Sequence, residues 1–341
     1  MAKKETDAIS LSRLKEDLRI KQPGRLYVFW GEEAYLREYY IKELRSCIEE
    51  EGGGNVEVFD KHNFSADGFS DAVLSYPMLT PRRFILVRDI DPYAPEARYK
   101  SLFEELLCDI PDFDCIVFDL GTAAPSGKKN KKIEEAVKDV GIALEFLRPS
   151  ESELTRWIIR RFAALEKNCQ PAEAALLARL CGGMMFSAIP EIEKVAAAAK
   201  TDRITSDDIN AMVTPVIDVV IYRITDAVTS RNRQSAISLL SSLIAQGTSC
   251  ITLASAIGRA MRQLYSARLF RDKGCPVSDF MEAWHLKSRY VADMIVSQAQ
   301  RFRPGALRKG VWACFETEMR LLNSEPDPRT ELEMLITELC K

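Results

Sequence analysis

The stretch Leu26-Tyr-Val-Phe-Trp-Gly-Glu-Glu-Ala-Tyr-Leu-Arg-Glu38 joins an unbroken apolar run to a glycine and then to a helical pattern. An unbroken apolar run is typical of a strand that is covered on both faces of a parallel sheet. Four similar runs follow, with helical patterns between them. The predicted strands are 26–30, 56–59, 84–87, 116–118 and 143–146, and the predicted helices are 35–51, 66–76, 99–107 and 132–140. This alternation predicts an α/β domain with a parallel sheet over residues 1–149.

Beyond residue 149 the sequence predicts helices alone. Ser150-Glu-Ser-Glu153 resembles a capping box ahead of a helix over 154–168, and Gly182-Gly183 ends the next helix. Patterns at 189–200 and 206–213 complete a small helical domain over 150–214. After it, helical segments separated by glycine or proline predict an antiparallel bundle over 215–341. These segments are 218–229, 233–246, 251–273, 287–301, 304–323 and 329–340.

The composition is typical of a globular protein. Of 341 residues, 47% are hydrophobic and 28% are charged, and no apolar run approaches the roughly 20 residues that cross a bilayer. Residues 1–10 lack the apolar segment of a secretion signal. The nine cysteines show no C-x-x-C spacing and there are only two histidines, which argues against a zinc site. Scattered thiols of this kind predict a reducing, cytoplasmic setting.

The turn after the first strand lies where a P-loop NTPase carries G-x-x-x-x-G-K-[ST]. Counted from Gly31, the second glycine is replaced by Leu36, the lysine by Arg37 and the hydroxyl residue by Glu38. A leucine blocks close approach of phosphate to the backbone, and glutamate offers magnesium no hydroxyl. A later strand ends at one acid, Asp119, without a glutamate beside it to orient a water. We therefore predict the scaffold of an NTPase without its chemistry, and no other catalytic motif such as G-x-S-x-G is present.

The predicted helix over 66–76 leads into a short apolar segment between two prolines. Its apolar stripe is Phe69, Ala72, Val73 and Tyr76. Pro77 follows, and then Met78 and Leu79, which either cap the core of the sheet or form an exposed contact with a partner. Both interpretations stay open on the residues alone. The prolines limit the entropy that docking would cost, and burying the two side chains would contribute roughly 3–6 kcal/mol.

Basic residues gather in two places, although the whole chain has a net charge of −3. Residues 219–309 contain fourteen Lys or Arg and only five Asp or Glu. The basic residues of interest are Lys128, Lys129, Lys131 and Lys132 in one run, and Arg259, Arg262, Arg268 and Arg271 on one predicted helix. The lysine run is either a solvated loop or a contact to the DNA backbone, and the arginines face either neighbouring proteins or DNA. Aromatic residues are not interleaved, so base-specific recognition is not expected.

Several of these stretches together resemble the delta subunit family of the bacterial DNA polymerase III clamp loader. The resemblance begins with the strand and loop at 26–36, and continues in Pro77-Met-Leu-Thr-Pro-Arg-Arg-Phe-Ile-Leu-Val-Arg88 and in the basic run 128–132. Further similar segments are Glu191-Ile-Glu-Lys-Val195, Ile204-Thr-Ser-Asp-Asp208, 247–264 and 301–335. The similarity covers nearly the whole chain in the family's order.

The resemblance implies an architecture and a contact site. An AAA+-like domain without a working P-loop, a small helical lid and a helical collar would correspond to 1–149, 150–214 and 215–341. Two hydrophobic residues at the tip of a helix insert into a pocket on the sliding clamp in this family, and they correspond to Met78 and Leu79, next to Pro77. The family often has Leu-Phe there, so the Met-Leu pair departs from its pattern. Its ATP sites lie on other subunits.

The resemblance also implies partners and a role in DNA replication. The partners are the sliding clamp (the beta subunit), the gamma/tau and delta-prime subunits through the collar, and primed DNA through the assembled complex, with no cofactor, metal or membrane. The chain would help to open the clamp and would not be an enzyme itself, although its complex carries DNA polymerase (nucleotidyltransferase) activity. Two other functions stay open: a divergent AAA+ NTPase with a nonstandard loop, and a nucleic-acid-binding scaffold that acts through 215–341.

Overall fold

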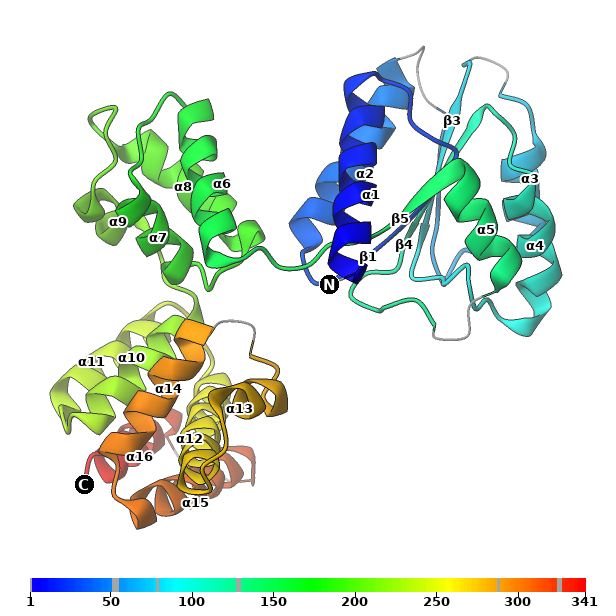
Figure 1. Ribbon diagram of the computed structural model, residues 1–341. Helices are drawn as coiled ribbons and strands as arrows, with labels where there is room; N and C mark the ends of the chain where they lie inside the picture. Colours follow the sequence, from blue (N-terminus) through cyan, green and yellow to red (C-terminus); the bar gives the residue numbers. More distant parts are fainter. Residues whose placement is uncertain (1, 51–54, 78–79, 127–129, 287–288, 324–326) are drawn as a thin grey trace. The chain divides into compact units, whose positions relative to one another are not determined.

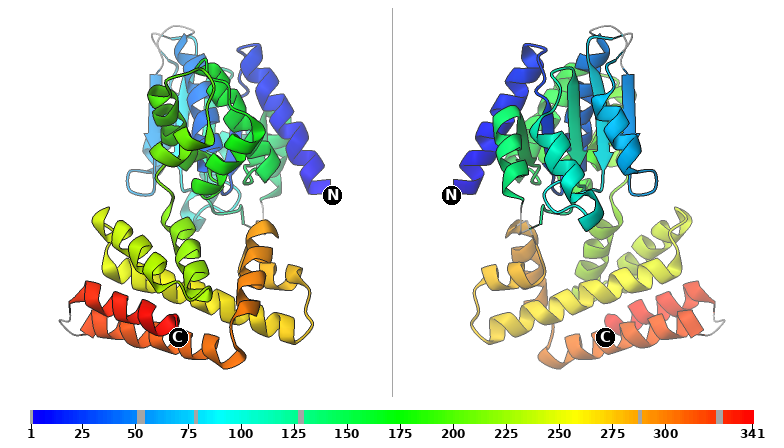
Figure 2. Two further views of the ribbon diagram at one scale, coloured as in Figure 1. Left: turned by 90° about the vertical axis from the view of Figure 1, so that its left-hand side faces the viewer. Right: turned by 90° about the vertical axis from the view of Figure 1, so that its right-hand side faces the viewer.

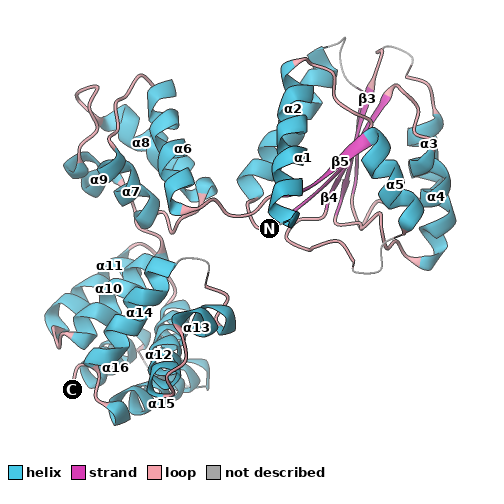
Figure 3. Cartoon of the chain, viewed as in Figure 1, coloured by secondary structure: helices cyan, strands magenta, loops and turns pink. Residues whose placement is uncertain are grey.

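The computed structural model describes residues 2–50, 55–77, 80–126, 130–286, 289–323 and 327–341. The chain forms two compact units, Met1–Pro149 and Ser150–Lys341. Within the described residues, the sheet belongs to the first unit and the second is built from helices (Figure 3). The predicted order, an α/β region followed by helices, is confirmed. The division of the chain into three domains stays a prediction.

Five parallel strands form the sheet, in the order β2-β3-β4-β1-β5. They are β1 (Leu26–Trp30), β2 (Asn55–Phe59), β3 (Arg83–Arg88), β4 (Asp114–Asp119) and β5 (Gly141–Glu145). Every residue of β1 and β4 is buried, because these strands lie inside the sheet and helices cover both of its faces (Figure 1). The unbroken apolar runs of the sequence are therefore explained, and the predicted parallel sheet is confirmed.

Side chains alternate across each strand, so the two faces of the sheet build separate cores. Leu26 and Val28 of β1 pack on the face covered by α3, α4 and α5, whereas Tyr27 and Phe29 pack on the face covered by α1 and α2 (Figure 1). The helices of this unit are α1 (Ala2–Arg19), α2 (Ala34–Glu50), α3 (Ala66–Leu74), α4 (Lys100–Cys108) and α5 (Lys131–Val140), with a 3-10 turn at Ala97–Tyr99.

Helix α1 was not predicted from the sequence. Its apolar side consists of Leu11, Leu14 and Leu18, one residue per turn, and most of the helix is polar or charged. Leu14 is nevertheless fully buried in the core of the α1 and α2 face. The hydroxyl of Tyr27 donates to Asp17 at 3.2 Å and joins the helix to β1. A narrow stripe of this kind becomes recognisable only when a sheet is present to cover it.

The second unit begins with four short helices. They are α6 (Glu151–Ala164), α7 (Pro171–Leu180), α8 (Met185–Ala198) and α9 (Ser206–Met212). The predicted capping box is confirmed, because the Ser150 hydroxyl accepts from the Glu153 amide at 3.3 Å and the Glu153 carboxylate accepts from the Ser150 amide at 2.8 Å. Helix α8 starts earlier than the predicted residue 189. Pro190 was placed in the first turn, which proline favours, but it lies inside the helix.

In the described part of the chain that follows, seven helices share one hydrophobic core. They are α10 (Ile217–Thr229), α11 (Arg233–Ala245), α12 (Cys250–Asp272), α13 (Val277–Ala283), α14 (Arg289–Arg301), α15 (Pro304–Asn323) and α16 (Pro328–Leu339). The long helix α12 packs against α14, α15 and α10 (Figure 2). The predicted helical bundle is confirmed, although the sequence did not predict α13. That helix has seven residues and begins directly after Pro276, in a stretch assigned to a turn.

Candidate functional site

The turn after β1 is closed by carbonyl groups of the protein. Gly31 has a φ of 122°, and a Cβ atom there would lie 2.4 Å from the carbonyl oxygen of Phe146. The Gly31 amide donates to Gly121 O at 2.9 Å, and the Glu33 amide donates to Phe146 O at 3.0 Å. In a P-loop the amides of this turn face phosphate oxygens. Here these two amides are bound by internal acceptors.

Arg37, at the position of the P-loop lysine, points into the protein. Its side chain is buried, and its Nε donates to Asp119 Oδ1 at 3.0 Å. Its Nη1 also donates to the carbonyl oxygen of Gly31. Asp119 accepts a second bond from the amide of Gly121 at 3.1 Å. A buried ion pair therefore joins the start of α2 to the end of β4, at the place where an NTPase would hold phosphates and metal.

The remaining two loop positions also interact within the protein. Leu36 packs against the core of the α1 and α2 face. The carboxylate of Glu38 accepts from both terminal nitrogens of Arg88, at 2.8 and 3.0 Å. Nη1 of Arg88 lies 3.8 Å from Asp119 Oδ2, so the surface pair adjoins the buried one. The sequence had singled out Asp119 but not Arg88, because nothing local connects β3 with residues fifty positions away.

Helix α3 ends in an exposed apolar segment. Ser65 caps its start by accepting from the Gly68 amide at 3.1 Å, and the stripe residues Phe69, Ala72 and Val73 are buried as predicted. Tyr76, predicted as the fourth member of this stripe, instead lies beyond the helix and is 71% exposed. The helix stops at Leu74 because residue 75 is extended, so Tyr76 does not continue the helical stripe. Leu74 is itself 60% exposed.

The three residues predicted to contact the clamp follow directly. Pro77 is buried. Met78 and Leu79 lie outside the described residues, so the predicted contact of these two side chains stays a prediction. The segment continues at Thr80, whose hydroxyl donates to the carbonyl of Arg82 at 2.8 Å.

A buried arginine holds the base of this segment. Arg83, at the start of β3, is 1% exposed, and it donates to Asp114 Oδ1 at 2.9 Å and to the Val73 carbonyl at 3.2 Å. Its guanidinium also lies 5.7 Å from the ring centre of Phe113, which in turn packs edge-on against Tyr76 at 5.1 Å. Burial raises the pKa of Asp114 to about 6, and the bond from Arg83 opposes this rise. Arg83 thus connects the end of α3 with β3 and β4, and Phe113 lies between Arg83 and the exposed Tyr76.

Helix α15 carries a second exposed apolar surface, which the sequence reasoning missed. Trp312 (62% exposed), Phe315, Met319 and Leu322 recur at spacings of three and four residues, so they share one face of the helix. The indole Nε1 of Trp312 donates to Glu316 at 2.7 Å, and its ring lies 5.6 Å from that of Phe315. The sequence contained a signal for this surface, because apolar residues occur on two opposite faces of the predicted helix 304–323.

The sequence of residues 218–339 matches the family model described as DNA polymerase III delta subunit, C-terminal domain. Residues 218–339 are therefore similar to the C-terminal domain of DNA polymerase III delta subunits. Among solved structures, the Bacillus subtilis DNA clamp loader delta protein (YqeN) is similar in fold, with a TM-score of 0.70 and 17% identity, over 96% of this chain and 98% of that chain. The resemblance to delta subunits predicted from the sequence is confirmed, by sequence in the C-terminal region and by fold along the chain.

A more distant match is the Thermotoga maritima RuvB Holliday junction branch migration motor. Its TM-score is 0.41 at 16% identity, over 66% of this chain and 75% of that chain. No curated protein matches the chain in sequence.

The basic run expected from the delta-subunit resemblance is only partly described. Lys128 and Lys129 lie outside the described residues. Lys131 is exposed at the start of α5, whereas Lys132 pairs with Glu104 at 3.1 Å. The side-chain amide of Asn130 donates to the same carboxylate at 2.7 Å. These bonds hold Lys132 against α4, which weakens the interpretation of this residue as a free contact to DNA phosphate.

The arginines of the delta-subunit region lie along α12 as predicted. Arg259 and Arg262 are exposed and form no ion pair with any described residue. Arg268 pairs with Asp272 at 2.9 Å and also donates to the carbonyl of Phe302. Arg271 is exposed near the end of the helix. The structure therefore leaves Arg259 and Arg262 accessible, and their contact with DNA or with a neighbouring protein stays a prediction.

Other expectations from the sequence concern metals and membranes. Among the described residues, no group of three or more His, Cys, Asp or Glu side chains is arranged to hold a metal ion. Both histidines, His62 and His285, are exposed. None of the helices in the described part of the chain combines the length and the apolar composition that crossing a membrane requires.

Proposed function

We propose that this chain grips the sliding clamp with the end of α3 and helps to open it for loading onto primed DNA. The observation that carries the proposal is the exposed apolar pair Leu74 and Tyr76 at the end of α3, which the buried Arg83 fixes through the Val73 carbonyl. The proposed contact residues are Met78 and Leu79, and the buried Pro77 beside them would hold the base of the contact. Because the base is fixed in the sheet, docking costs little conformational entropy, and a tighter grip on an opened clamp shifts the ring towards opening.

The proposal includes that the chain neither binds nor hydrolyses ATP, and that partner subunits do so. Two amides of the turn after β1 and the guanidinium of Arg37 already have acceptors within the protein. A phosphate group would have to displace the buried pair between Arg37 and Asp119, and it would meet the carboxylate of Glu38. Measurable ATP binding by the isolated chain would instead favour the divergent AAA+ NTPase.

We propose that residues 215–341 form the collar that joins the gamma/tau and delta-prime subunits, with 150–214 as the lid and 1–149 as the AAA+-like domain. The stripe of α15 supports this assignment, because a row of exposed Trp, Phe, Met and Leu is typical of the centre of a protein interface. Primed DNA would be met through the assembled complex, in the cytoplasm. Tight, salt-sensitive duplex binding by the isolated chain would favour a nucleic-acid scaffold.

One pull-down experiment with the clamp and the loader subunits of the same organism tests both contacts. The double change Met78→Asp and Leu79→Asp should abolish clamp capture and leave subunit capture unchanged. Trp312→Asp should abolish subunit capture and leave clamp capture unchanged. In both variants the reason is that burying an ionised carboxylate in an apolar contact costs much free energy. The matched control is Ile9→Asp, a 70% exposed apolar residue on α1, across the sheet from α3 (Figure 1).

Circular dichroism of each variant excludes unfolding as the cause of any loss. Clamp capture that survives the double change would overturn the clamp contact. Subunit capture that survives Trp312→Asp would overturn the assignment of α15 while leaving the clamp contact intact.

A further inference from the structure

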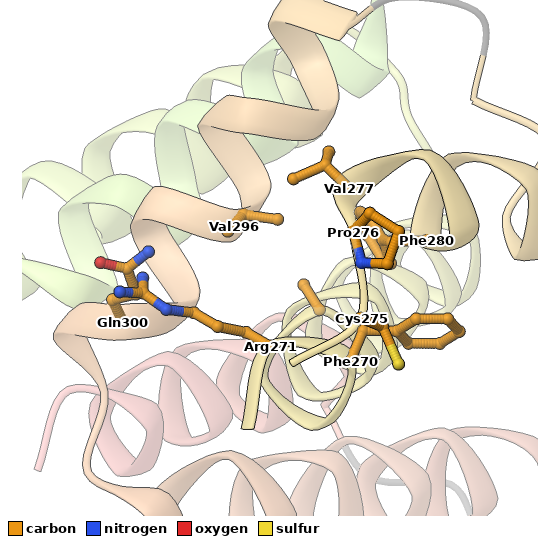
Figure 4. A pocket seen from close by; sticks show the side chains of 9 residues that line it. Phe270, Arg271, Cys275, Pro276, Val277, Phe280, Val296 and Gln300 are labelled. Carbon is orange, nitrogen blue, oxygen red and sulfur yellow. The ribbon is translucent and has the colours of Figure 1, made fainter. Parts of the chain in front are cut away.

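A pocket of about 290 Å³ opens between the end of α12, the start of α13 and the second half of α14 (Figure 4). Its apolar lining includes Ala267 and Phe280, which are almost fully buried, together with Phe270 and Val296. The rings of Phe270 and Phe280 pack 6.0 Å apart and stabilise one wall. This volume lies at the lower limit of ligand sites, so it suits one apolar side chain better than a cofactor.

The polar groups of the pocket are gathered at one end. Arg271 from α12 and Gln300 from α14 reach the same end of the pocket in Figure 4, whereas Pro276 and Val277 lie at the other. Both polar residues are exposed, and Arg271 forms no ion pair with any described residue. The adjacent carboxylate of Asp272 is bound by Arg268 at 2.9 Å. A guanidinium and an amide therefore lie at one end of an apolar pocket, and none of the described carboxylates forms an ion pair with this guanidinium.

We propose that this pocket binds the C-terminal residue of a partner polypeptide. The apolar side chain of that residue fills the pocket, and its terminal carboxylate accepts hydrogen bonds from Arg271 and Gln300. Guanidinium groups bind carboxylates through strong, charge-assisted bonds. A terminal residue carries its side chain and its carboxylate on the same Cα atom, which brings both within the span of so small a site. This contact is separate from the end of α3 and does not depend on clamp binding.

Fluorescence anisotropy with the full chain tests the proposal. The probes are labelled pentapeptides of glycine and serine that end in Phe, Leu or Ser, each with a free carboxylate or a terminal amide. Peptides that end in Phe or Leu should bind saturably as free acids. Those that end in Ser, and all the amides, should bind at least about tenfold more weakly. Arg271→Gln should reduce the affinity for the free acids about tenfold and leave that for the amides unchanged.

The matched control is Arg308→Gln, which removes an exposed arginine from α15 and should change nothing. Val296→Asp should weaken every peptide, because it places a carboxylate in the apolar wall. Equal binding of acid and amide, unchanged affinity in Arg271→Gln, or no saturable binding at millimolar peptide would each overturn the proposal. An amidated peptide with an internal Phe-Asp that binds as tightly as the free acids would assign the site to an internal segment instead.

Discussion

The two ends of β4 carry buried ion pairs of the same kind in different surroundings. At the start of the strand, Asp114 pairs with Arg83 at 2.9 Å, and at its end Asp119 pairs with Arg37 at 3.0 Å. Asp119 also accepts from the Gly121 amide and lies near Arg88, whereas Asp114 Oδ2 has no hydrogen-bond partner among the described residues. All strands of the sheet run in the same direction. The pair of Asp114 therefore lies where the strands begin, the amino edge of the sheet, and the pair of Asp119 lies where they end, the carboxyl edge.

The two buried arginine–aspartate pairs therefore have different structural roles. At the carboxyl edge, the pair lies at the turn where a P-loop would hold phosphates, and the amides of Gly31 and Glu33 are bound by carbonyl groups of the protein. At the amino edge, Arg83 also donates to the Val73 carbonyl and thereby fixes the end of α3, where the proposed clamp contact begins. The first pair closes the turn after β1, and the second fixes the end of α3.

The largest expected effect comes from breaking the pair at the amino edge. Arg83→Ala leaves the carboxylate of Asp114 buried without a cation and removes the donor to the Val73 carbonyl. We expect the free energy of local unfolding of β3 and β4 to fall by about 3–5 kcal/mol. Hydrogen exchange of the amides of 83–88 and 114–119 measures it locally, which avoids the assumption that the whole chain unfolds in one step.

The matched control is the double variant Arg83→Ala with Asp114→Leu. It removes both charges and should recover most of the loss, because no unpaired ion then stays buried. A single variant that loses less than about 1 kcal/mol would contradict the picture of a fully desolvated pair.

The next effect is a dependence on pH at the same edge. Burial raises the pKa of Asp114 from 3.8 to about 6, so the folded protein keeps this proton in a range where the unfolded chain has lost it. The unfolded state then binds fewer protons, and the contribution of Asp114 to stability falls as the pH rises from about 4 to about 6. A shift of this size corresponds to about 3 kcal/mol.

The difference in unfolding free energy between the native chain and Asp114→Asn isolates this term, since the other carboxylates cancel. The native chain should lose about 3 kcal/mol relative to the variant between pH 4 and pH 7. A difference that grows in favour of the native chain with rising pH would mean that Arg83 outweighs burial and that the assigned direction is wrong.

Local patterns predicted most of the fold, and the limits of that prediction have physical causes. The continuous run at β1 predicts a strand because two covered faces select apolar residues at every position. Tyr76 was wrongly assigned to the buried stripe, since its spacing fits a helix that in fact ends at Leu74. Helix α1 escaped prediction because its charged composition hides a single row of leucines.

The sequence predicted which residues form the candidate site, but not which contacts they make. The residues at 36–38 depart from the P-loop pattern, and this departure can be read from the sequence alone. That Arg37 turns inward depends on Asp119, 82 positions away, and no local pattern records such a contact. The same holds for Arg83, which the sequence presented as part of a charged Arg-Arg pair and which the structure buries. Contacts between residues far apart in the sequence are therefore the part of the site that local patterns could not predict.

The smallest expected effect lies at the carboxyl edge and sharpens the comparison. Arg37→Ala removes one partner of Asp119 but leaves the Gly121 amide at 3.1 Å and Arg88 at 3.8 Å. We expect a loss of about 2–3 kcal/mol, less than for Arg83→Ala, in hydrogen exchange of the amides of 114–119. The control Arg88→Ala removes a partly exposed pair with Glu38 and should cost less than about 1 kcal/mol. If Arg37→Ala costs as much as Arg83→Ala, the remaining partners of Asp119 do not compensate. If the Arg37→Ala chain binds ATP, the buried pair is a lock on a functional nucleotide site and not the replacement for one.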